Sequence, residues 1–281
     1  MFAKNALWSM PPKSGLCHTL VKVCFAVAGF AALAASALTT VRAEPAAAPT
    51  ANATFSDEQK KAIGDIVKDY LLKNPEVLVD IQTALEAKLE KEQSEKLKTF
   101  MTENAKNIYR GADSTVAGDP NGDITVVEFF DYNCGYCKRG LTEVQKLIQS
   151  DKKVRFVFKE LPILSKGSEE AARAALAAKR QGKYWEFHQV LLAAKGQANE
   201  ASSLKAAEGL GLDMAKFKAD MAGNDVKEEL DKMKVLAKSM GINGTPHFLV
   251  GDKSIPGAPE NLHEQLESLV TEFRKTGCSA C

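Results

Sequence analysis

Apolar residues recur at intervals of three and four positions between residues 55 and 110, and this spacing predicts a helical arm. Ser56 and Gln59 have the spacing of a capping box at the start of the first helix, and Asn74-Pro75 separates it from a second. The second helix carries a narrow apolar stripe made of Leu78, Ile81, Leu85 and Leu89. Because such a stripe needs a partner, we expect the arm to associate with copies of itself. Folding back onto its own domain is the alternative.

The hydrophobic pattern changes near residue 123, where the spacing typical of strands begins. Residues 123–130 are β-branched and aromatic, residues 141–148 have helical spacing and residues 154–161 alternate. We therefore expect a parallel, right-handed β-α-β unit over this part of the chain. The following interval, about 165–240, is rich in Ala, Lys and Glu and is expected to form several successive helices.

Two short strands and a last helix follow this helical interval. The strands are expected at residues 247–250 and 253–256, on either side of a Gly251-Asp252 turn. Pro259 then begins a helix that runs to Glu272. This order of elements predicts an α/β fold class, in which a mixed central sheet is interrupted by a helical insertion and preceded by the helical arm.

The first 43 residues have the pattern of a signal peptide. They contain Lys4, Lys13 and Lys22 but no acidic residue, and an apolar run of about 16 residues ends shortly before a small-x-small site at Ala43. We expect cleavage near Ala43 and export of the mature chain, whose residues 44–54 form a flexible leader rich in Ala and Pro. An uncleaved membrane anchor is the alternative, although the run is shorter than the roughly 20 residues that span a bilayer.

Composition narrows the class of protein. Of 281 residues, 45% are hydrophobic and 26% charged, which excludes a mainly disordered or collagen-like chain. The 37 basic and 36 acidic residues nearly cancel, so the chain has no general field for nucleic acid and no nucleic-acid partner is expected. Removal of the signal peptide leaves four cysteines in two Cys-x-x-Cys pairs, and export places them where disulfides persist.

The first pair, Cys134 and Cys137, lies at the junction of the first strand and its helix. The dipole and free N–H groups of the helix N-terminus stabilise a thiolate at Cys134, so we expect it to be the attacking and more exposed sulfur. Cys137 lies one turn inside the helix and is expected to be the buried, resolving sulfur. Half of a zinc site, completed by Cys278 and Cys281, is the alternative.

A second candidate segment is Gly244-Thr245-Pro246-His247, which precedes the strand at residues 247–250. A proline at this place is either cis or an ordinary trans turn proline. In the cis form, the Thr245 backbone is free to pair with an extended substrate that passes the sulfurs. His247 either faces the sulfurs, where it stabilises the thiolate, or points to solvent.

Residues 128–138 and 241–246 together resemble the DsbA-like branch of the thioredoxin superfamily, and the resemblance extends over about 118–276. Residues 69–78 are similar to the N-terminal segment of ScsC- and Com1-type members. The resemblance implies a thioredoxin-like fold and a cis bond before Pro246. It also implies oligomers held by residues 55–110, with isomerase or reductase activity, and some members are linked to copper tolerance.

The resemblance also implies roles for individual residues. Glu128 and Lys159 are expected near the buried sulfur, where they help to move protons, and a structural ion pair between the two strands is the alternative. Tyr136 lies between the cysteines, where it influences the reduction potential and contacts substrate. The tail at residues 277–281 departs from the family, and a local disulfide, a second exchange relay and soft-metal capture are all open.

We therefore expect a periplasmic thiol-disulfide oxidoreductase that exchanges disulfides with exported proteins, acting as an oligomeric disulfide isomerase. Its redox centre is the Cys134–Cys137 disulfide, with no other cofactor and no metal, and a membrane protein is expected as its redox partner. A monomeric dithiol oxidase and a thiolate copper-binding protein are the alternative functions.

Overall fold

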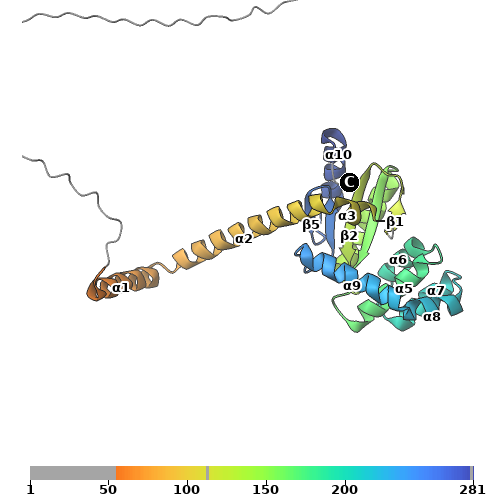
Figure 1. Cartoon of the computed structure of the whole chain (residues 1–281), viewed down its shortest axis with the longest axis horizontal. Coiled ribbons are helices and arrows are strands. Elements are labelled where there is room, and N and C mark those ends of the chain that lie inside the picture. The colour runs from red at the N-terminus through yellow and green to blue at the C-terminus, as the bar shows by residue number, and fades with distance from the viewer. Residues whose placement is uncertain (1–54, 112–113, 279–280) are drawn as a thin grey trace, which may run out of the picture. The chain divides into compact units, whose positions relative to one another are not determined.

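The computed structural model describes residues 55–111, 114–278 and 281, and Figure 1 shows their secondary structure. The predicted signal peptide, its cleavage near Ala43 and the leader of residues 44–54 lie outside these residues. The chain divides into two units, with the boundary between Ile63 and Gly64. None of the helices in the described ranges has both the length and the hydrophobicity of a membrane-spanning segment.

Two helices begin the described part of the chain, α1 (Asp57–Lys73) and α2 (Glu76–Glu103). The predicted capping box is confirmed, since the Ser56 N–H donates to Gln59 Oε1 at 2.9 Å and the Gln59 N–H to Ser56 Oγ at 3.2 Å. Large apolar side chains along both helices are 44–72% exposed, namely Ile63, Ile66, Val67, Tyr70, Leu72, Leu78, Val79, Ile81, Leu85 and Leu89. The predicted stripe is therefore uncovered within the described chain.

The last part of α2 and the short helix α3 (Ala105–Arg110) belong to the core of the second unit. Leu97 and Met101 of α2 and Ile108 and Tyr109 of α3 are buried in one apolar cluster with residues of the sheet. The Tyr109 hydroxyl donates to the Gly251 carbonyl at 2.6 Å. Residues 97–109, which the prediction placed in the arm, thus contribute to the core of the second unit.

Within the described residues, five strands form one mixed sheet in the order β1-β3-β2-β4-β5. Strands β2 and β3 are parallel and the other neighbours are antiparallel, which confirms the predicted α/β class with a mixed sheet. The strands are β1 (Thr115–Gly118), β2 (Ile124–Phe130), β3 (Val154–Glu160), β4 (His247–Val250) and β5 (Lys253–Pro256). The sequence did not predict β1, which is a four-residue strand at the edge of the sheet.

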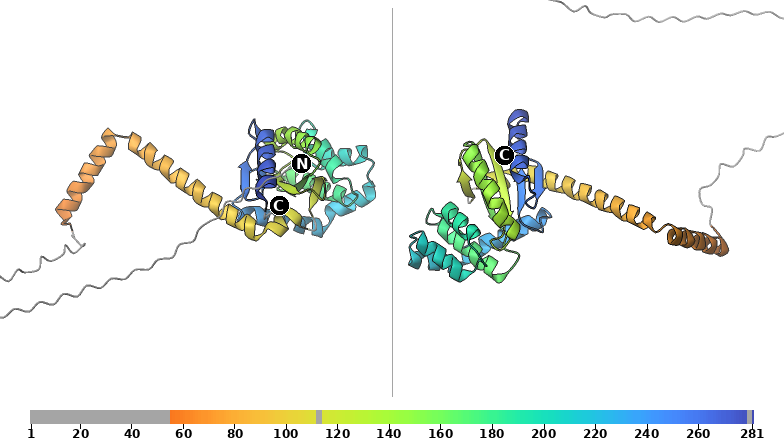
Figure 2. Two further views of the ribbon diagram at one scale, coloured as in Figure 1. Left: turned by 90° about the horizontal axis from the view of Figure 1, so that it is seen from above. Right: turned by 180° about the vertical axis from the view of Figure 1, so that it is seen from behind.

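Helices cover both faces of the sheet, as Figures 1 and 2 show. The helix that follows β2 is α4 (Gly135–Ser150), and the last is α10 (Leu262–Thr276), which begins three residues after Pro259. The predicted insertion consists of α5 (Lys166–Lys179), α6 (Tyr184–Ala193), α7 (Glu200–Gly209), α8 (Met214–Ala222) and α9 (Asn224–Ser239).

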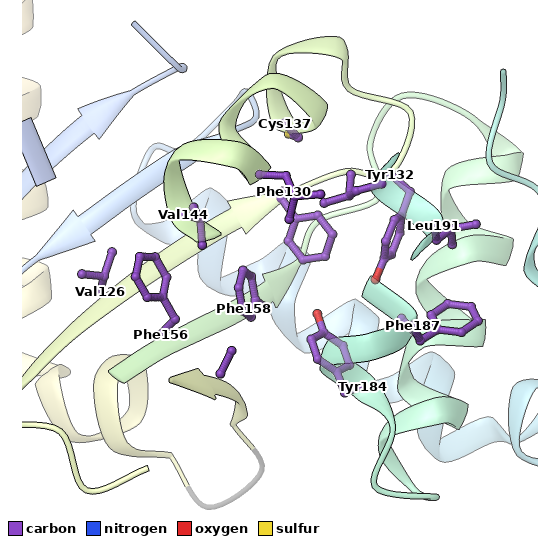
Figure 3. Packing of buried hydrophobic residues seen from close by; sticks show 14 of the residues in the cluster. Val126, Phe130, Tyr132, Cys137, Val144, Phe156, Phe158, Tyr184, Phe187 and Leu191 are labelled. Atoms are coloured by element: carbon purple, nitrogen blue, oxygen red, sulfur yellow. The ribbon is translucent and has the colours of Figure 1, made fainter. Parts of the chain in front are cut away.

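The alternation of side chains along β2 and β3 divides the core into two clusters. Val126, Phe130, Phe156 and Phe158 lie in the first cluster with residues of α4 and α6 (Figure 3). Residues of α10 belong to the same cluster. Val127, Phe129 and Val157 lie in the second cluster, with α2, α3 and the end of α9. The face from which a side chain projects therefore decides which helices it meets.

Candidate active site

Cys134 is the N-cap residue of α4, directly after β2 and its connecting turn. Its Sγ atom accepts a hydrogen bond from the Cys137 N–H at 3.3 Å. The pKa of Cys134 is lowered to about 6, first by a hydrogen bond from the Cys137 thiol and then by the N–H groups of Cys137 and Tyr136, while burial opposes the shift. These donors stabilise a thiolate at neutral pH, as the helix N-terminus predicts.

Cys137 differs from its neighbour in burial. It is 0% exposed and Cys134 is 5% exposed, so the predicted order of exposure holds although both residues are buried. Burial is the main cause that raises the pKa of the Cys137 thiol far above its ordinary value. In this arrangement Cys134 ionises first and Cys137 retains its proton.

Glu128 lies in the middle of β2 and is 2% exposed. Its Oε1 atom is buried and has no hydrogen-bond partner in the described part of the chain. Burial raises the pKa of the carboxyl well above its usual range, and the charge of Cys134 raises it further. Glu128 also raises the pKa of Cys137 through its charge, so it is electrostatically coupled to both sulfurs.

The expectation that Lys159 lies near the buried sulfur is wrong. In the parallel pairing of β2 with β3, Lys159 is opposite Phe129, whereas Glu128 is opposite Phe158. Because Phe129 and Phe158 belong to the clusters on opposite faces, Lys159 and Glu128 project from opposite faces of the sheet. The ion pair that we considered between these two residues is excluded for the same reason.

Both predicted placements of His247 are also wrong. His247 is directly opposite Phe129 in the antiparallel pairing of β2 with β4, so its side chain lies on the face away from Glu128. The imidazole is half-buried, no described residue forms a hydrogen bond with its Nε2 atom, and burial lowers its pKa to about 4. A neutral ring in this place neither faces the sulfurs nor points to solvent.

The predicted cis bond between Thr245 and Pro246 is confirmed. This segment lies against the first sulfur, because Cys134 Sγ donates to the Thr245 carbonyl at 3.2 Å while it is protonated. Tyr136 is 60% exposed, and the Arg139 guanidinium lies 4.8 Å from the centre of its ring. Thus two segments far apart in the sequence meet at Cys134.

Two residues of the turn before Cys134 were not singled out from the sequence. Asp131 accepts hydrogen bonds from the N–H groups of Asn133, Ile163 and Leu164 at 2.8–3.0 Å. Asn133 exchanges two hydrogen bonds with the backbone of Ala198, at 2.7 and 2.9 Å. They fasten the turn to the loop after β3 and to the insertion. The signal was present, since Asp and Asn between a strand and a helix are typical turn residues.

A buried polar network lies beside this turn and was also missed. The hydroxyls of Tyr184 and Tyr132 donate to Glu160 Oε1 at 2.7 and 3.4 Å, and the Tyr132 hydroxyl lies 3.3 Å from His188 Nδ1. Burial raises the pKa of Glu160 well above its usual range and lowers that of His188 to about 3. The network joins the active-site turn to α6, with both ionisable groups near their neutral forms.

The cysteine pair of the tail forms a local disulfide between Cys278 and Cys281, one of the three arrangements left open by the sequence. The Cys281 carbonyl accepts a hydrogen bond from Arg110 Nε at 3.0 Å. The described residues contain no group of three or more His, Cys, Asp and Glu side chains placed to hold a metal ion.

A mixed thioredoxin-like sheet, a Cys-x-x-Cys pair at a helix N-terminus and a cis-proline against the first sulfur define a thiol-disulfide oxidoreductase. The DSBA-like thioredoxin domain matches residues 125–267, and the chain belongs to this family. The N-terminal domain of the copper resistance protein ScsC matches residues 59–92, which lie on α1 and α2.

Solved structures agree with this assignment. A thioredoxin-like oxidoreductase from Silicibacter pomeroyi DSS-3 is 45% identical, with a TM-score of 0.58, over 61% of this chain and 98% of that one. An ScsC variant with a deleted linker from Proteus mirabilis is 27% identical, with a TM-score of 0.60. That similarity covers 80% of this chain and 99% of the variant, so it includes more of this chain than the catalytic domain alone.

Among curated proteins, the chain spans about a quarter of the length of the first relatives that it matches. One is the Na(+)/H(+) antiporter NhaA 3 of Salinispora tropica, 31% identical over 56% of this chain and 24% of the antiporter. Disulfide bond formation protein D of Bacillus subtilis is 30% identical over 50% of this chain and 68% of that protein.

Proposed function

We propose that this protein exchanges disulfides with exported proteins in the periplasm, as an oligomeric disulfide isomerase. The observation that carries the proposal is Cys134, whose pKa of about 6 and contact with Thr245 provide a thiolate beside a substrate-binding segment. The predicted signal peptide supports export, and the exposed apolar residues of α1 and α2 support self-association.

The reaction begins when the Cys134 thiolate attacks one sulfur of a substrate disulfide. The substrate S–S bond breaks, a mixed disulfide forms, and the other substrate sulfur leaves as a thiolate. The substrate backbone lies along Thr245-Pro246, and Tyr136, exposed beside Cys134, contacts its side chains. In isomerisation the freed substrate thiolate attacks a different disulfide of the substrate and so produces a new substrate thiolate. This thiolate attacks the mixed disulfide, forms a new substrate disulfide and releases the Cys134 thiolate.

In the competing branch Cys137 resolves the mixed disulfide. Its proton passes to the Glu128 carboxylate, whose raised pKa makes it a suitable acceptor, and the Cys137 thiolate attacks Cys134 Sγ. The Cys134–Cys137 disulfide forms, and the substrate leaves with two more electrons. A membrane reductase that supplies two electrons then restores the dithiol.

The oligomer bears on the direction of exchange. Helices α1 and α2 carry the apolar residues, and the match to the ScsC N-terminal domain falls on the same helices. Association through these residues would place several Cys134 thiolates around one substrate and restrict the approach of a membrane oxidase. The pairs would then remain reduced, which isomerisation requires.

A monomeric dithiol oxidase is the second candidate, and one observation favours it. A thiolate with a pKa of about 6 stabilises the reduced form, which makes the corresponding disulfide a stronger oxidant. A copper-binding protein that uses the free thiols Cys134 and Cys137 is the third candidate, favoured by the match to the ScsC domain.

Refolding of scrambled and of reduced ribonuclease distinguishes these functions. We expect the full mature chain to restore activity to the scrambled enzyme and the Cys134→Ser variant to restore none. Recovery of the reduced substrate alone would overturn the isomerase and leave the oxidase. Failure with both substrates, together with stoichiometric copper(I) capture that Cys134→Ser abolishes, would overturn the enzymatic function.

A further inference from the structure

A cavity of about 590 Å³ lies beside the end of β3, and its lining residue Lys159 projects from the face of the sheet away from the two redox cysteines. Its walls come from the end of β3, the C-terminal end of α5 and the first turns of α9, together with Gly111 and Ser114. The volume lies within the range of about 300–1,000 Å³ that small-ligand sites occupy. Nothing in the exchange reaction uses this cavity.

Lys159 lines the cavity, and its amine is only partly compensated. The residue is 6% exposed, and within the described residues no hydrogen bond or ion pair joins its Nζ atom to another group. Burial lowers its pKa to about 8, the charges of Lys179 and Arg155 lower it further, and the charge of Glu229 offsets part of the shift. An anion in the cavity would compensate the ammonium more fully.

Of the four acidic residues that line the cavity, three have other partners. Glu229 forms an ion pair with Lys179 at 2.9 Å, and Asp225 forms one with Arg180. The Glu160 carboxyl accepts from two tyrosine hydroxyls, and Glu228 is an exposed residue of α9. None of these carboxyl groups makes an ion pair with Lys159.

Ser114 supplies a second, independent observation at the same cavity. Ser114 lines the cavity, and its buried Oγ atom has no hydrogen-bond partner among the residues that the structure describes. A buried hydroxyl is ordinarily hydrogen-bonded, because leaving it unpaired costs about 1–3 kcal/mol. The cavity therefore contains two unused donors, an amine and a hydroxyl, which together suit an anionic acceptor.

The apolar residues of the lining indicate the second part of the ligand. Leu176 and Leu230 are buried apolar residues, and Met233 is a partly buried one. We propose that the cavity binds a small organic carboxylate whose head accepts hydrogen bonds from Lys159 Nζ and Ser114 Oγ. The apolar part of this ligand lies against Leu176, Leu230 and Met233.

Calorimetric titration of the full mature chain with hexanoate tests the proposal. The uncharged hexanamide, which has the same chain length, and inorganic phosphate are the comparison probes. We expect hexanoate to bind saturably and at least tenfold more tightly than either probe. The Cys134→Ser variant should bind it equally well, which excludes the redox centre as the site and separates this proposal from the proposed function.

Variants of the lining residues give the decisive comparison. Lys159→Met should weaken hexanoate binding at least tenfold and Ser114→Ala several-fold, whereas Lys232→Met, which removes an exposed cation of the same cavity, should change it less than twofold. Thermal unfolding shows that each variant is folded, and Lys159→Gln replaces Lys159→Met if the latter is not. Equal binding of hexanamide or phosphate, undiminished binding by the Lys159 variant, or no binding to the wild-type chain would overturn the proposal.

Discussion

At the residue scale, two thiols three positions apart have opposite properties because their surroundings differ. Cys134 receives hydrogen bonds from Cys137 and from backbone N–H groups at the start of α4, and its pKa falls to about 6. Cys137 is fully buried on the next turn and its pKa rises. The division into attacking and resolving sulfur therefore follows from the place of each residue on one helix.

The lowered pKa of Cys134 predicts a pH profile. Because the thiolate exists above the pKa, alkylation by iodoacetamide should increase through a midpoint near pH 6, well below the value of about 8.5 for a free thiol. The stabilisation of the reduced fold by this thiolate should increase as the pH rises from about 6 to about 8.5. It should be lost as the pH falls through 6. Measuring alkylation rates between pH 4 and 9 tests this range.

The hydrogen bond from Cys137 is the main cause of the lowered Cys134 pKa, so variants of Cys137 provide the control. Cys137→Ala removes the hydrogen bond from the Cys137 side chain, so the midpoint for Cys134 should rise by about one pH unit or more, whereas Cys137→Ser, which retains a donor, should raise it less. A wild-type midpoint between pH 8 and 9 would contradict the assignment of Cys134 as the stabilised thiolate.

Glu128→Gln should slow the resolving step. The amide has the shape of the carboxyl but cannot accept the Cys137 proton, so release of glutathione from a mixed disulfide at Cys134 should slow by about 10²-fold or more. Stopped-flow fluorescence of the pre-formed mixed disulfide measures this step alone. An unchanged rate would show that water or the leaving thiolate takes the proton instead.

The sequence correctly predicted the placement of residues whose environment is set by their neighbours in the chain. The strand-turn-helix pattern places Cys134 and Cys137, and the resemblance indicated the cis bond before Pro246, which the structure confirms. The placements of Lys159 and His247 depend on how β2 pairs with β3 and β4. A shift of one residue in that register reverses the face, and the sequence does not specify the register.

At the scale of elements, α2 has two environments along its length. Leu85 and Leu89 are 53% exposed, whereas Leu97 is 7% and Met101 1% exposed, because the end of the helix packs under the sheet. Helical spacing predicted the helix but not this change, since an apolar stripe does not reveal which surface covers it. The edge strand β1 was missed because four residues give too short a pattern.

This difference predicts the effects of two substitutions on the same helix. Met101→Ala should lower the free energy of unfolding by about 2–5 kcal/mol, because it opens a cavity in the second cluster. Lys98→Ala removes an exposed ion pair with Asp252 and should cost less than about 1 kcal/mol. Urea unfolding of both variants measures the contrast, and similar losses would contradict the burial of this part of α2.

At the scale of the whole molecule, the N-terminal helices and the catalytic domain share residues. A truncation that tests self-association must therefore spare the buried part of α2. Gln93 of α2 donates to the Gly241 carbonyl at 3.1 Å, and Leu97 begins the buried segment. A chain that begins at Glu92 retains both contacts, whereas one that begins at Gly111 loses the buried residues of α2 and α3.

We expect the chain beginning at Glu92 to be folded and monomeric, and the chain beginning at Glu44 to be oligomeric. The chain beginning at Gly111 should fail to fold, because it lacks Leu97, Met101, Ile108 and Tyr109. Light scattering and circular dichroism measure mass and folding. Equal masses for the two longer chains would remove the argument for self-association, and a folded chain from Gly111 would contradict the packing of α2 and α3.

The Cys278–Cys281 disulfide adds a second redox couple to the chain. In the predicted mature chain, two separate couples store up to four electrons, and of these two the Cys134–Cys137 couple lies at the reaction centre. Thiol counting should give two reactive groups per chain under mild reduction and four after complete reduction. A reduction potential derived from total thiols would therefore average two unrelated couples, and a Cys278→Ser/Cys281→Ser background isolates the catalytic one.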